Sequence, residues 1–333
     1  MFSYANQIIM GVNRMENVKV DVILVTYNRL ECLKKALDAL QKQNYPIHKI
    51  FVYNNASIDG TDKYLENSGF TTVKSEMELK DVYPNQKLIT FLSSENLGGA
   101  GGFSASFKYL SQFDSDYIWI MDDDVAPTSN CLEELLKYLK KEKVKAVIPR
   151  RVGPGYTDSI CTNIDMKNWR KFWTWWRKDT ISNPTEKETY SVVDMAFEGP
   201  LFDTNLVRQV GTPDAEFFIL YDDTDYSQRI LKYTKILYVT NAILNRQLPP
   251  KAGDLGNKPY NWRMYYRLRN NIVFDRKYGE NWCVKHISPR LLCLQTMLLA
   301  VRDHHVKSNV PLIWKAYRDG MKHRMGKRVD PNY

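Results

Sequence analysis

Two clusters of aspartates are the residues of this sequence best suited to chemistry. Residues 122–124 are three aspartates directly after the apolar run YIWIM. Like charges repel, so three adjacent carboxylates at the end of a buried strand are costly unless a cation compensates them. Mg²⁺ and Mn²⁺ favour carboxylate oxygens and bind jointly with substrate phosphates, which predicts a divalent-cation site at Asp122 and Asp124. The alternative interpretation is a solvated acidic turn that caps the next helix.

The second acidic cluster, Asp222-Asp223-Thr224-Asp225, follows the apolar run FFILY. A hydroxyl group attacks poorly while it keeps its proton, and a nearby carboxylate can remove that proton. We predict Asp223 as this general base, with Asp222 and Asp225 orienting the loop or capping a helix over 226–232. The alternative is an acid-rich helix N-terminus without a catalytic role.

Residues 96–103, NLGGAGGF, contain four glycines. The loop lacks the Lys-Ser/Thr pair of a phosphate-binding loop and the spacing of a dinucleotide fingerprint. Its glycines nevertheless allow the backbone to approach a ligand closely just before a helix begins. We therefore expect a binding loop that includes Asn96, Gly98 and Gly99, with a tight structural turn as the alternative.

The apolar patterning predicts the elements that position these residues. β-branched or apolar runs at 18–26, 49–53, 88–92, 117–121 and 146–149 predict strands, and helical patterns stand between them. This alternation predicts an α/β fold with a mostly parallel sheet flanked by helices. Each polar cluster directly follows a strand, and ligands of open α/β sheets bind outside the carboxyl ends of the strands. We therefore expect the clusters at 27–29, 54–57, 96–102 and 122–124 to converge on one ligand.

Charge is distributed unevenly along the 333 residues. The chain has a net charge of +9, yet residues 261–333 contain 15 Lys and Arg against 5 Asp and Glu. This basic, mainly helical region includes the aromatic–arginine run YNWRMYYRLRNN at 260–271 and an apolar stretch at 291–301. Such helices predict binding to a membrane surface, with packing against the rest of the protein as the alternative.

The sequence also predicts a compartment. The five cysteines are odd in number, widely spaced and without a CxxC pair, which indicates reduced thiols. Residues 1–17 lack the features of a signal peptide, and the apolar stretch at 291–301 is shorter than the roughly 20 residues that cross a bilayer. We expect a cytoplasmic protein, peripheral on the inner face of the cell membrane.

Six short motifs follow one another within residues 18–245. They are VTYNR at 25–29, NASIDGT at 55–61, NLGGAGGF at 96–103, MDDD at 121–124, EGPLF at 198–202 and FFILYDDTD at 217–225. In this order they resemble the inverting glycosyltransferases of family 2, which have the GT-A fold. The doubled-glycine loop and the run DDTDY most resemble bacterial galactofuranosyltransferases, followed by rhamnosyltransferase-like members.

The resemblance implies transfer of a sugar from a UDP- or dTDP-linked donor to a hydroxyl of a cell-surface glycan or lipid-linked acceptor. Galactofuranose from UDP-galactofuranose is the expected donor, and a divalent cation, Mn²⁺ or Mg²⁺, is the expected cofactor. The implied nucleotide-sugar contacts are Thr26, Asn28, Arg29, Asn54, Asn55, Asp59, Asn96, Gly98, Gly99, Asp122 and Asp123. The implied acceptor contacts are Glu198, Gly199 and Asp222, the metal ligands are Asp122, Asp124 and Asn245, and Asp223 is the base. Trp173 is a further expected acceptor contact, because the tryptophans within residues 169–176 could form an acceptor-facing flap; the alternative is a hydrophobic patch under a loop.

Two positions depart from the family pattern. Many relatives have Asp where this chain has Asn54, and many have a metal-binding His where residues 242–247 read AILNRQ. Asn245 is the nearest match, and its amide oxygen is a weaker ligand for Mn²⁺ than imidazole. The expected organisation is a catalytic domain over 18–250, with a nucleotide-sugar half to about 150 and an acceptor half after it. An N-terminal extension at 1–17 and the basic region at 251–333 flank it.

Other functions remain as alternatives. A rhamnosyltransferase or other hexosyltransferase of the same family would share every motif. A nucleotidyltransferase would carry a glycine-rich loop with Lys or Arg directly after the first strand, where this chain has Thr26-Tyr27-Asn28-Arg29. A non-catalytic glycan-binding relative is compatible with the missing His. The basic tail suggests a nucleic-acid-binding protein, but two acidic clusters at the expected site argue against a nucleic-acid groove there.

Overall fold

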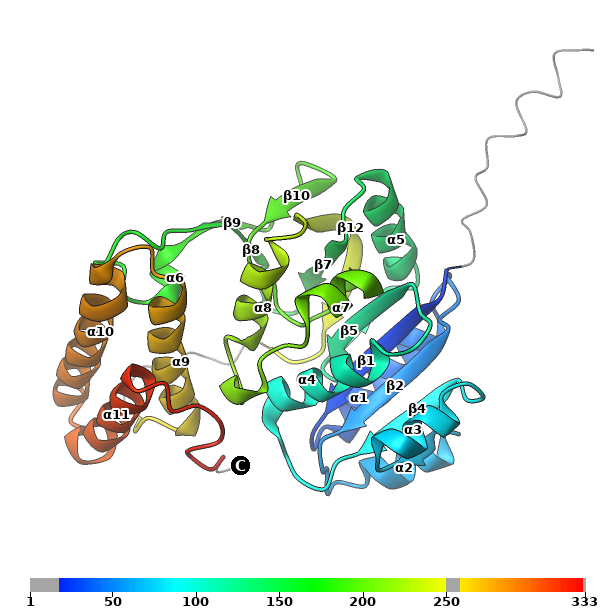
Figure 1. The fold of residues 1–333 in the computed structure, drawn as a ribbon, viewed down its shortest axis with the longest axis horizontal. Coiled ribbons are helices and arrows are strands. Elements are labelled where there is room, and N and C mark those ends of the chain that lie inside the picture. Colours follow the sequence, from blue (N-terminus) through cyan, green and yellow to red (C-terminus); the bar gives the residue numbers. More distant parts are fainter. Residues whose placement is uncertain (1–17, 250–257, 332–333) are drawn as a thin grey trace, which may run out of the picture.

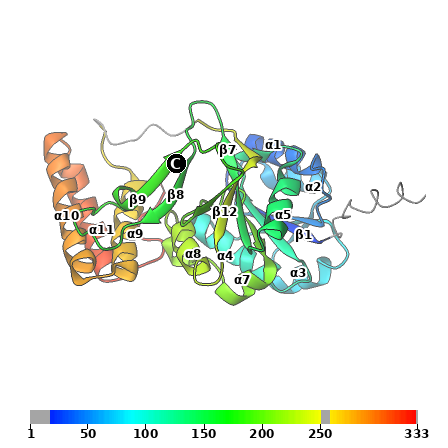
Figure 2. The same cartoon turned by 90° about the horizontal axis from the view of Figure 1, so that it is seen from above.

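The computed structural model describes residues 18–249 and 258–331. The expected extension at 1–17 and the expected boundary at residue 250 lie outside the described residues. Within them, a ten-stranded sheet has the order β10-β12-β7-β11-β5-β1-β2-β4-β3, and β6 pairs with β12. Helices cover both faces of this sheet, and three further helices lie to one side of it (Figures 1 and 2).

The N-terminal half alternates strands and helices. In chain order its elements are β1 (Val20–Thr26), α1 (Leu30–Gln41), β2 (Lys49–Asn54), α2 (Thr61–Asn67), β3 (Thr71–Val73), α3 (Glu76–Val82), β4 (Leu88–Leu92), α4 (Gly98–Leu110), β5 (Tyr117–Asp122), β6 (Val125–Pro127), α5 (Cys131–Lys141) and β7 (Ala146–Val152). The strand pairs β5–β1, β1–β2, β2–β4 and β4–β3 are all parallel. The prediction of a mostly parallel sheet is confirmed, although β3, α3 and β6 were not predicted.

The core lies in two layers because successive residues of a strand point to opposite faces. Val20, Val22 and Leu24 of β1 pack with α1, α2 and α5 on one face. Ile23 and Val25 pack with α3 and α4 on the other face. These five side chains of β1 are all buried, so the register of the strand is fixed. The position of its carboxyl end is fixed with it.

The chain then continues through shorter elements. They are β8 (Ser159–Ile164), α6 (Thr174–Arg177), β9 (Lys178–Ser182), β10 (Thr189–Val192), β11 (Leu201–Asp203), α7 (Thr204–Val210), the 3-10 turn η1 (Ala215–Phe217), α8 (Asp222–Ile230) and β12 (Ile236–Arg246). β11 runs antiparallel between β5 and β7, which makes the sheet mixed. The helix expected at 226–232 begins earlier, at Asp222, so the second acidic cluster forms its first turn.

Three helices follow: α9 (Trp262–Tyr278), α10 (Trp282–Arg302) and α11 (Val306–Met321). α9 is largely buried, including the polar residues Arg269, Asn270 and Asn271, each fully inaccessible to solvent. The membrane-binding expectation is therefore corrected for the run at 260–271, because this helix packs inside the protein. Among the described residues, no helix combines the length and apolarity needed to cross a membrane.

Candidate active site

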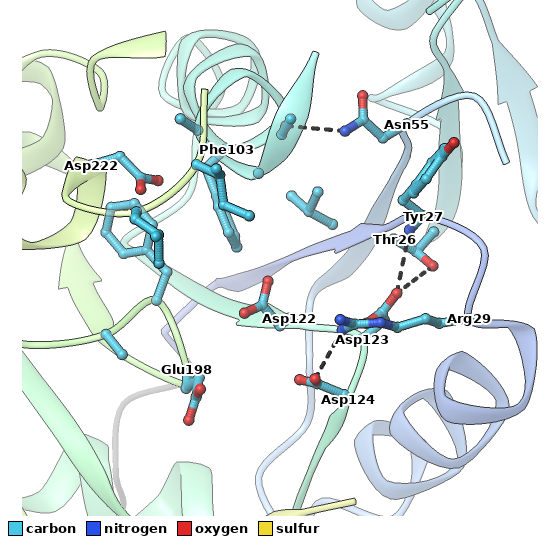
Figure 3. Close-up of a pocket in the computed structure, with 18 of the residues that line it drawn as sticks. Thr26, Tyr27, Arg29, Asn55, Phe103, Asp122, Asp123, Asp124, Glu198 and Asp222 are labelled. Carbon is cyan, nitrogen blue, oxygen red and sulfur yellow. Dashed lines mark hydrogen bonds and ion pairs between the residues drawn. The ribbon is translucent and has the colours of Figure 1, made fainter. Parts of the chain in front are cut away.

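A cavity of about 820 Å³ lies where the carboxyl ends of β1, β2 and β5 meet. Its lining includes Thr26, Asn28 and Arg29 at the carboxyl end of β1, Asn55 after β2 and the three aspartates at the carboxyl end of β5. Asn96, Gly98 and Gly99 contribute from the glycine-rich loop, and Asp222 and Asp223 from α8. The predicted convergence of distant polar clusters on one cavity is confirmed (Figure 3).

Arg29 neutralises part of the first acidic cluster. Its Nη1 atom lies 3.0 Å from Asp123 Oδ1 and 2.8 Å from Asp124 Oδ2. Asp123 also accepts a hydrogen bond of 2.8 Å from the Thr26 hydroxyl, which fixes it at the floor of the cavity. Burial raises the pKa of Asp123 to about 6, against the opposing effect of Arg29. Asp123 therefore joins β1 to β5 and positions Arg29.

The Asp122 carboxylate forms no ion pair with a described residue, and Arg29 only partly offsets its charge. Burial, followed by the neighbouring carboxylates of Asp124 and Asp123, raises its pKa well above the usual range. Its carboxylate points into the cavity (Figure 3), and no described residue donates a hydrogen bond to it. Excess charge on hard oxygen ligands fits Mg²⁺ or Mn²⁺. Among the described residues, no group of three or more His, Cys, Asp or Glu is arranged to hold a metal ion by itself.

The glycine-rich loop packs against Phe218, in the segment that precedes the second acidic cluster. Gly98 has φ +74°, and a Cβ atom on it would lie 2.1 Å from the carbonyl oxygen of Phe218. Glycine is therefore required at this position because the loop lies close to another part of the chain. The sequence predicted a close approach to a ligand instead. Asn55 fixes the same loop through Nδ2 bonds of 3.0 Å to Asn96 Oδ1 and to the Gly98 carbonyl.

The segment before Asp222 has an unusual backbone. Phe218, Leu220 and Tyr221 all have positive φ values, of 66°, 66° and 73°. Non-glycine residues reach this region at a cost of about 1–3 kcal/mol each, and such strain persists only where the surroundings enforce it. Asn270 of α9 enforces it here, because its Nδ2 donates to the carbonyls of Ile219 at 2.8 Å and Leu220 at 2.9 Å.

Asp223 occupies the boundary between two cavities. It lines the large cavity and also a second one of about 470 Å³. Burial raises the pKa of Asp223 to about 6, with a further rise from Asp194 and an opposing effect of Lys178. Asp222 faces only the large cavity, and burial raises its pKa well above the usual range. Asp223 is thus the carboxylate that can contact a molecule in each cavity.

Glu198 lines the large cavity opposite the aspartates of β5 (Figure 3). Arg151 Nη1 lies 3.5 Å from one of its carboxylate oxygens, and Arg246 Nη1 lies 3.6 Å from the other. Gly199 does not line the cavity. It has φ +85° and leaves no room for a Cβ atom, which would lie 2.7 Å from Pro149. This glycine therefore permits the turn that presents Glu198.

Four other predicted residues lie outside the cavity lining. Asn54 and Asp59 serve the loops, accepting hydrogen bonds from the backbone N–H groups of Ser57 and Leu30, at 2.9 Å each. Trp173 is corrected as an acceptor contact, because it is buried among the C-terminal helices and donates to Gln295 at 2.7 Å. Asn245 is corrected as a metal ligand, because its side chain is exposed and donates to the Ala126 carbonyl at 3.2 Å.

α9 supplies residues that the sequence did not assign to the site. Trp262 and Arg263 line the large cavity, and Arg267 lines the second one. Asp225 is fully buried and forms an ion pair with Lys277, which joins α8 to α9. The run YNWRMYYRLRNN could have indicated these site residues, because a helix that combines so many aromatic residues with arginines and asparagines is unusual.

Comparisons with known proteins identify a family for this chain. The family model for glycosyl transferase family 2 matches residues 21–211, more than half of the chain. Galactofuranosyltransferase GlfT1 from Mycolicibacterium smegmatis is 26% identical over 227 residues, covering 64% of this chain and 65% of the relative. GlfT1 from Mycobacterium tuberculosis is 27% identical over 223 residues, covering 64% of each chain. The matches thus span just under two thirds of the length of these curated relatives.

Solved structures share the fold at low sequence identity. The mannosyltransferase PcManGT from Pyrobaculum calidifontis, in complex with GDP-Man and Mn²⁺, has a TM-score of 0.51 at 16% identity, over 90% of this chain and 74% of that one. TarS 1-349 from S. aureus, in complex with UDP-GlcNAc, has a TM-score of 0.52 at 15% identity, over 92% of this chain and 82% of that one. These similarities support the GT-A architecture. Because the family model covers more than half of its residues, this chain belongs to glycosyl transferase family 2.

Proposed function

We propose that this enzyme transfers galactofuranose from UDP-galactofuranose, with inversion, to a hydroxyl of a cell-surface glycan or lipid-linked acceptor. The main observation in support of this reaction is the position of Asp223, which borders both cavities. The choice of donor is supported by the similarity to the two galactofuranosyltransferases over 64% of the chain.

In this mechanism the large cavity holds the donor. Arg29 and the polar loops at its floor bind and orient the nucleotide diphosphate. An acceptor oxygen attacks the anomeric carbon from the side opposite the diphosphate, and the new C–O bond forms as the bond to the diphosphate oxygen breaks. The leaving diphosphate keeps the electron pair, and the Asp223 carboxylate takes the acceptor's proton.

Asp122 and Asp124 would hold the divalent cation together with the donor. When bound, the cation supplies positive charge beside the leaving diphosphate. The unpartnered carboxylate of Asp122 supports this assignment, and the lack of a complete protein ligand set among the described residues favours binding together with nucleotide-sugar. We expect Mn²⁺ alone to stabilise the protein less than Mn²⁺ added with UDP.

A panel of donors tests the proposal. Thermal unfolding and product formation are measured with UDP-galactofuranose, UDP-galactopyranose, UDP-glucose and dTDP-rhamnose, each with Mn²⁺, Mg²⁺ or EDTA. UDP-galactofuranose with cation should give the largest stabilisation and the fastest turnover. Equal stabilisation by UDP-glucose would contradict the donor, and preference for dTDP-rhamnose would favour a rhamnosyltransferase. Asp122→Asn should remove the cation-dependent part of the stabilisation, whereas unchanged cation dependence would contradict the metal assignment.

We also propose peripheral binding to an anionic membrane through the C-terminal helices. Leu294, Leu298 and Val301 of α10 are 55%, 61% and 57% exposed. Their spacing places them along one stripe of the helix. The excess of basic residues after residue 260 complements an anionic lipid surface.

A further inference from the structure

The second cavity contains an arginine that forms no ion pair with any residue in the described part of the chain. It is lined by Trp175, Lys178, Arg267 and Asp223, among others. Within the described residues, Arg267 makes no salt bridge and no side-chain hydrogen bond, and its guanidinium lies 5.9 Å from the centre of the Trp175 ring. A half-buried guanidinium whose donors are not taken up by the described residues is suited to bidentate binding of an oxyanion.

The other cation of this cavity is already neutralised. Lys178 forms a close ion pair with Asp194, and both side chains are mostly buried. Burial opposes the charge of Lys178, but Asp194 raises its pKa. Lys178 therefore balances the acidic side of the cavity near Asp223, and Arg267 is the group left to meet a negative charge on a ligand.

Trp175 packs beside Arg267 although 42% of it is exposed. Its ring stacks on the buried Trp173, with centroids 4.0 Å apart. Thr174, before it in the chain, donates to Asn271 Oδ1 through its backbone N–H at 2.8 Å and its hydroxyl at 2.9 Å. An exposed aromatic ring anchored in this way offers an apolar surface for the C–H groups of a sugar.

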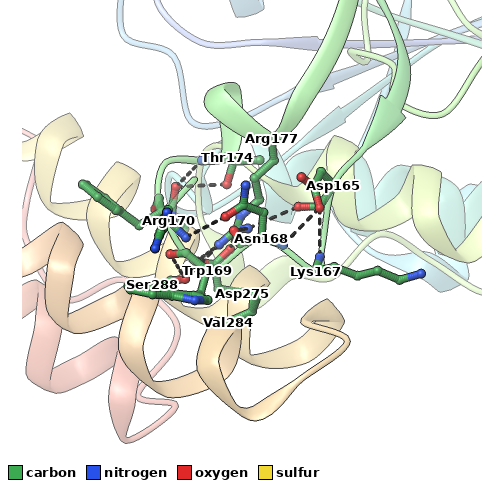
Figure 4. A network of polar contacts seen from close by, with 12 residues as sticks. Asp165, Lys167, Asn168, Trp169, Arg170, Thr174, Arg177, Asp275, Val284 and Ser288 are labelled. Carbon is green, nitrogen blue, oxygen red and sulfur yellow. Dashed lines mark hydrogen bonds and ion pairs between the residues drawn. The ribbon is translucent and has the colours of Figure 1, made fainter.

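Arg177 anchors the other side of the same turn. It is fully buried, and its guanidinium binds both carboxylate oxygens of Asp275 at 3.1 Å. It also donates to Ser288 at 3.1 Å and to the carbonyl of Asn168 at 2.7 Å (Figure 4). Because Trp175 stands between two anchored residues, the second cavity is pre-organised before a ligand binds.

From these contacts we infer that the second cavity is an acceptor subsite for a sugar that carries an oxyanion, with Arg267 binding the oxyanion and Trp175 contacting the sugar. This inference rests on the proposed function, because it assigns the donor to the large cavity. Asp223 borders the subsite, so an acceptor hydroxyl at the shared boundary lies next to the base. A phosphate ester and a uronic acid present the same chemistry to Arg267.

Titration of the donor-blocked protein tests the inference. The full chain is saturated with UDP or dTDP and Mn²⁺, and calorimetry then follows the binding of galactose, galactose 1-phosphate and galacturonic acid. At least one of the two anionic sugars should bind about tenfold or more tightly than galactose, since an oxyanion gains charge-assisted hydrogen bonds. The stronger of the two identifies the source of the charge.

Two substitutions in α9 test whether Arg267 causes the preference for anionic sugars. Arg267→Gln should abolish it, whereas Arg276→Gln, an arginine of the same helix that lines neither cavity, should keep it. Equal binding of galactose and both anionic sugars, or a preference that survives in Arg267→Gln, would overturn the inference while leaving the donor site intact. A protein that binds neither UDP nor dTDP in the first step would instead refute the proposed function, and this inference with it.

Discussion

Asp223 is the residue on which the proposed chemistry depends most directly. Its carboxylate borders both cavities, whereas Asp222 faces only the large one. Asp223→Asn keeps the size of the side chain and removes the proton acceptor. We expect transfer to fall by about 10²–10⁴-fold, while the affinity for UDP, measured by calorimetry, stays within about twofold of the wild type.

A matched substitution controls for the loss of one negative charge. Asp38→Asn removes an exposed carboxylate of α1 whose partner is Lys42 at 2.7 Å, a surface pair of little energetic weight. This variant should transfer sugar at the wild-type rate. Asp223→Asn turnover close to that of Asp38→Asn would show that another group removes the proton.

The pH profile reports on the same carboxylate. Burial, with Asp194 adding to it, raises the pKa of Asp223 to about 6. A base works only when deprotonated, so kcat/KM should level off above this pH and fall about tenfold per unit below it. Asp194→Asn removes a nearby negative charge and frees Lys178, and both changes favour the charged form of Asp223. The inflection should therefore move to lower pH, and movement to higher pH would exclude Asp223 as its source.

The contact between the glycine-rich loop and the segment before α8 leaves little room for a larger side chain. Gly98→Ala places a Cβ atom 2.1 Å from the Phe218 carbonyl at a φ of +74°. Gly99→Ala meets no atom within 4 Å, so it provides the control. In urea unfolding, we expect Gly98→Ala to lose on the order of 3 kcal/mol and Gly99→Ala to gain up to about 1 kcal/mol. Equal free energies of unfolding for the two variants would mean that the backbone is not closely packed at Gly98.

Local patterns explain why much of the fold was predictable. The strand that ends at Thr26 and the strand that ends at Asp122 are apolar runs followed at once by polar residues, and this pattern depends only on neighbours in the sequence. Their convergence follows from the rule that parallel strands share a carboxyl edge. The short strand β3 was missed because its three residues are too few to show a period.

The errors at the site concern side chains whose surroundings come from distant parts of the chain. Nothing local separates Trp173 from Trp175, yet packing against α9 and α10 buries the first and leaves the second 42% exposed. Asn245 lies in β12, where successive side chains alternate between faces, so the cavity receives Arg246. These outcomes depend on tertiary packing, which sequence spacing does not encode.

On the scale of the whole molecule, α9 connects the parts that catalysis requires. Asn270 holds the strained segment before Asp222, Arg263 lines the large cavity, and Arg267 lines the second cavity one helical turn away. α10 and α11 pack against α9 and leave an apolar stripe on α10 exposed. A membrane that bound this stripe would therefore contact the same helical bundle that lines the second cavity.

Vesicle binding tests whether that outer face meets lipid. The protein should co-sediment with vesicles containing about one third phosphatidylglycerol, less with pure phosphatidylcholine, and less again in high salt, which screens the basic residues. The double variant Leu294→Gln, Leu298→Gln should weaken binding by about tenfold or more, because each leucine loses apolar burial. Met77→Gln, a 75% exposed position on α3, should bind as the wild type does. Undiminished binding of the double variant would show that lipid contacts another face, since its basic residues are unchanged and only the α10 stripe has been made polar.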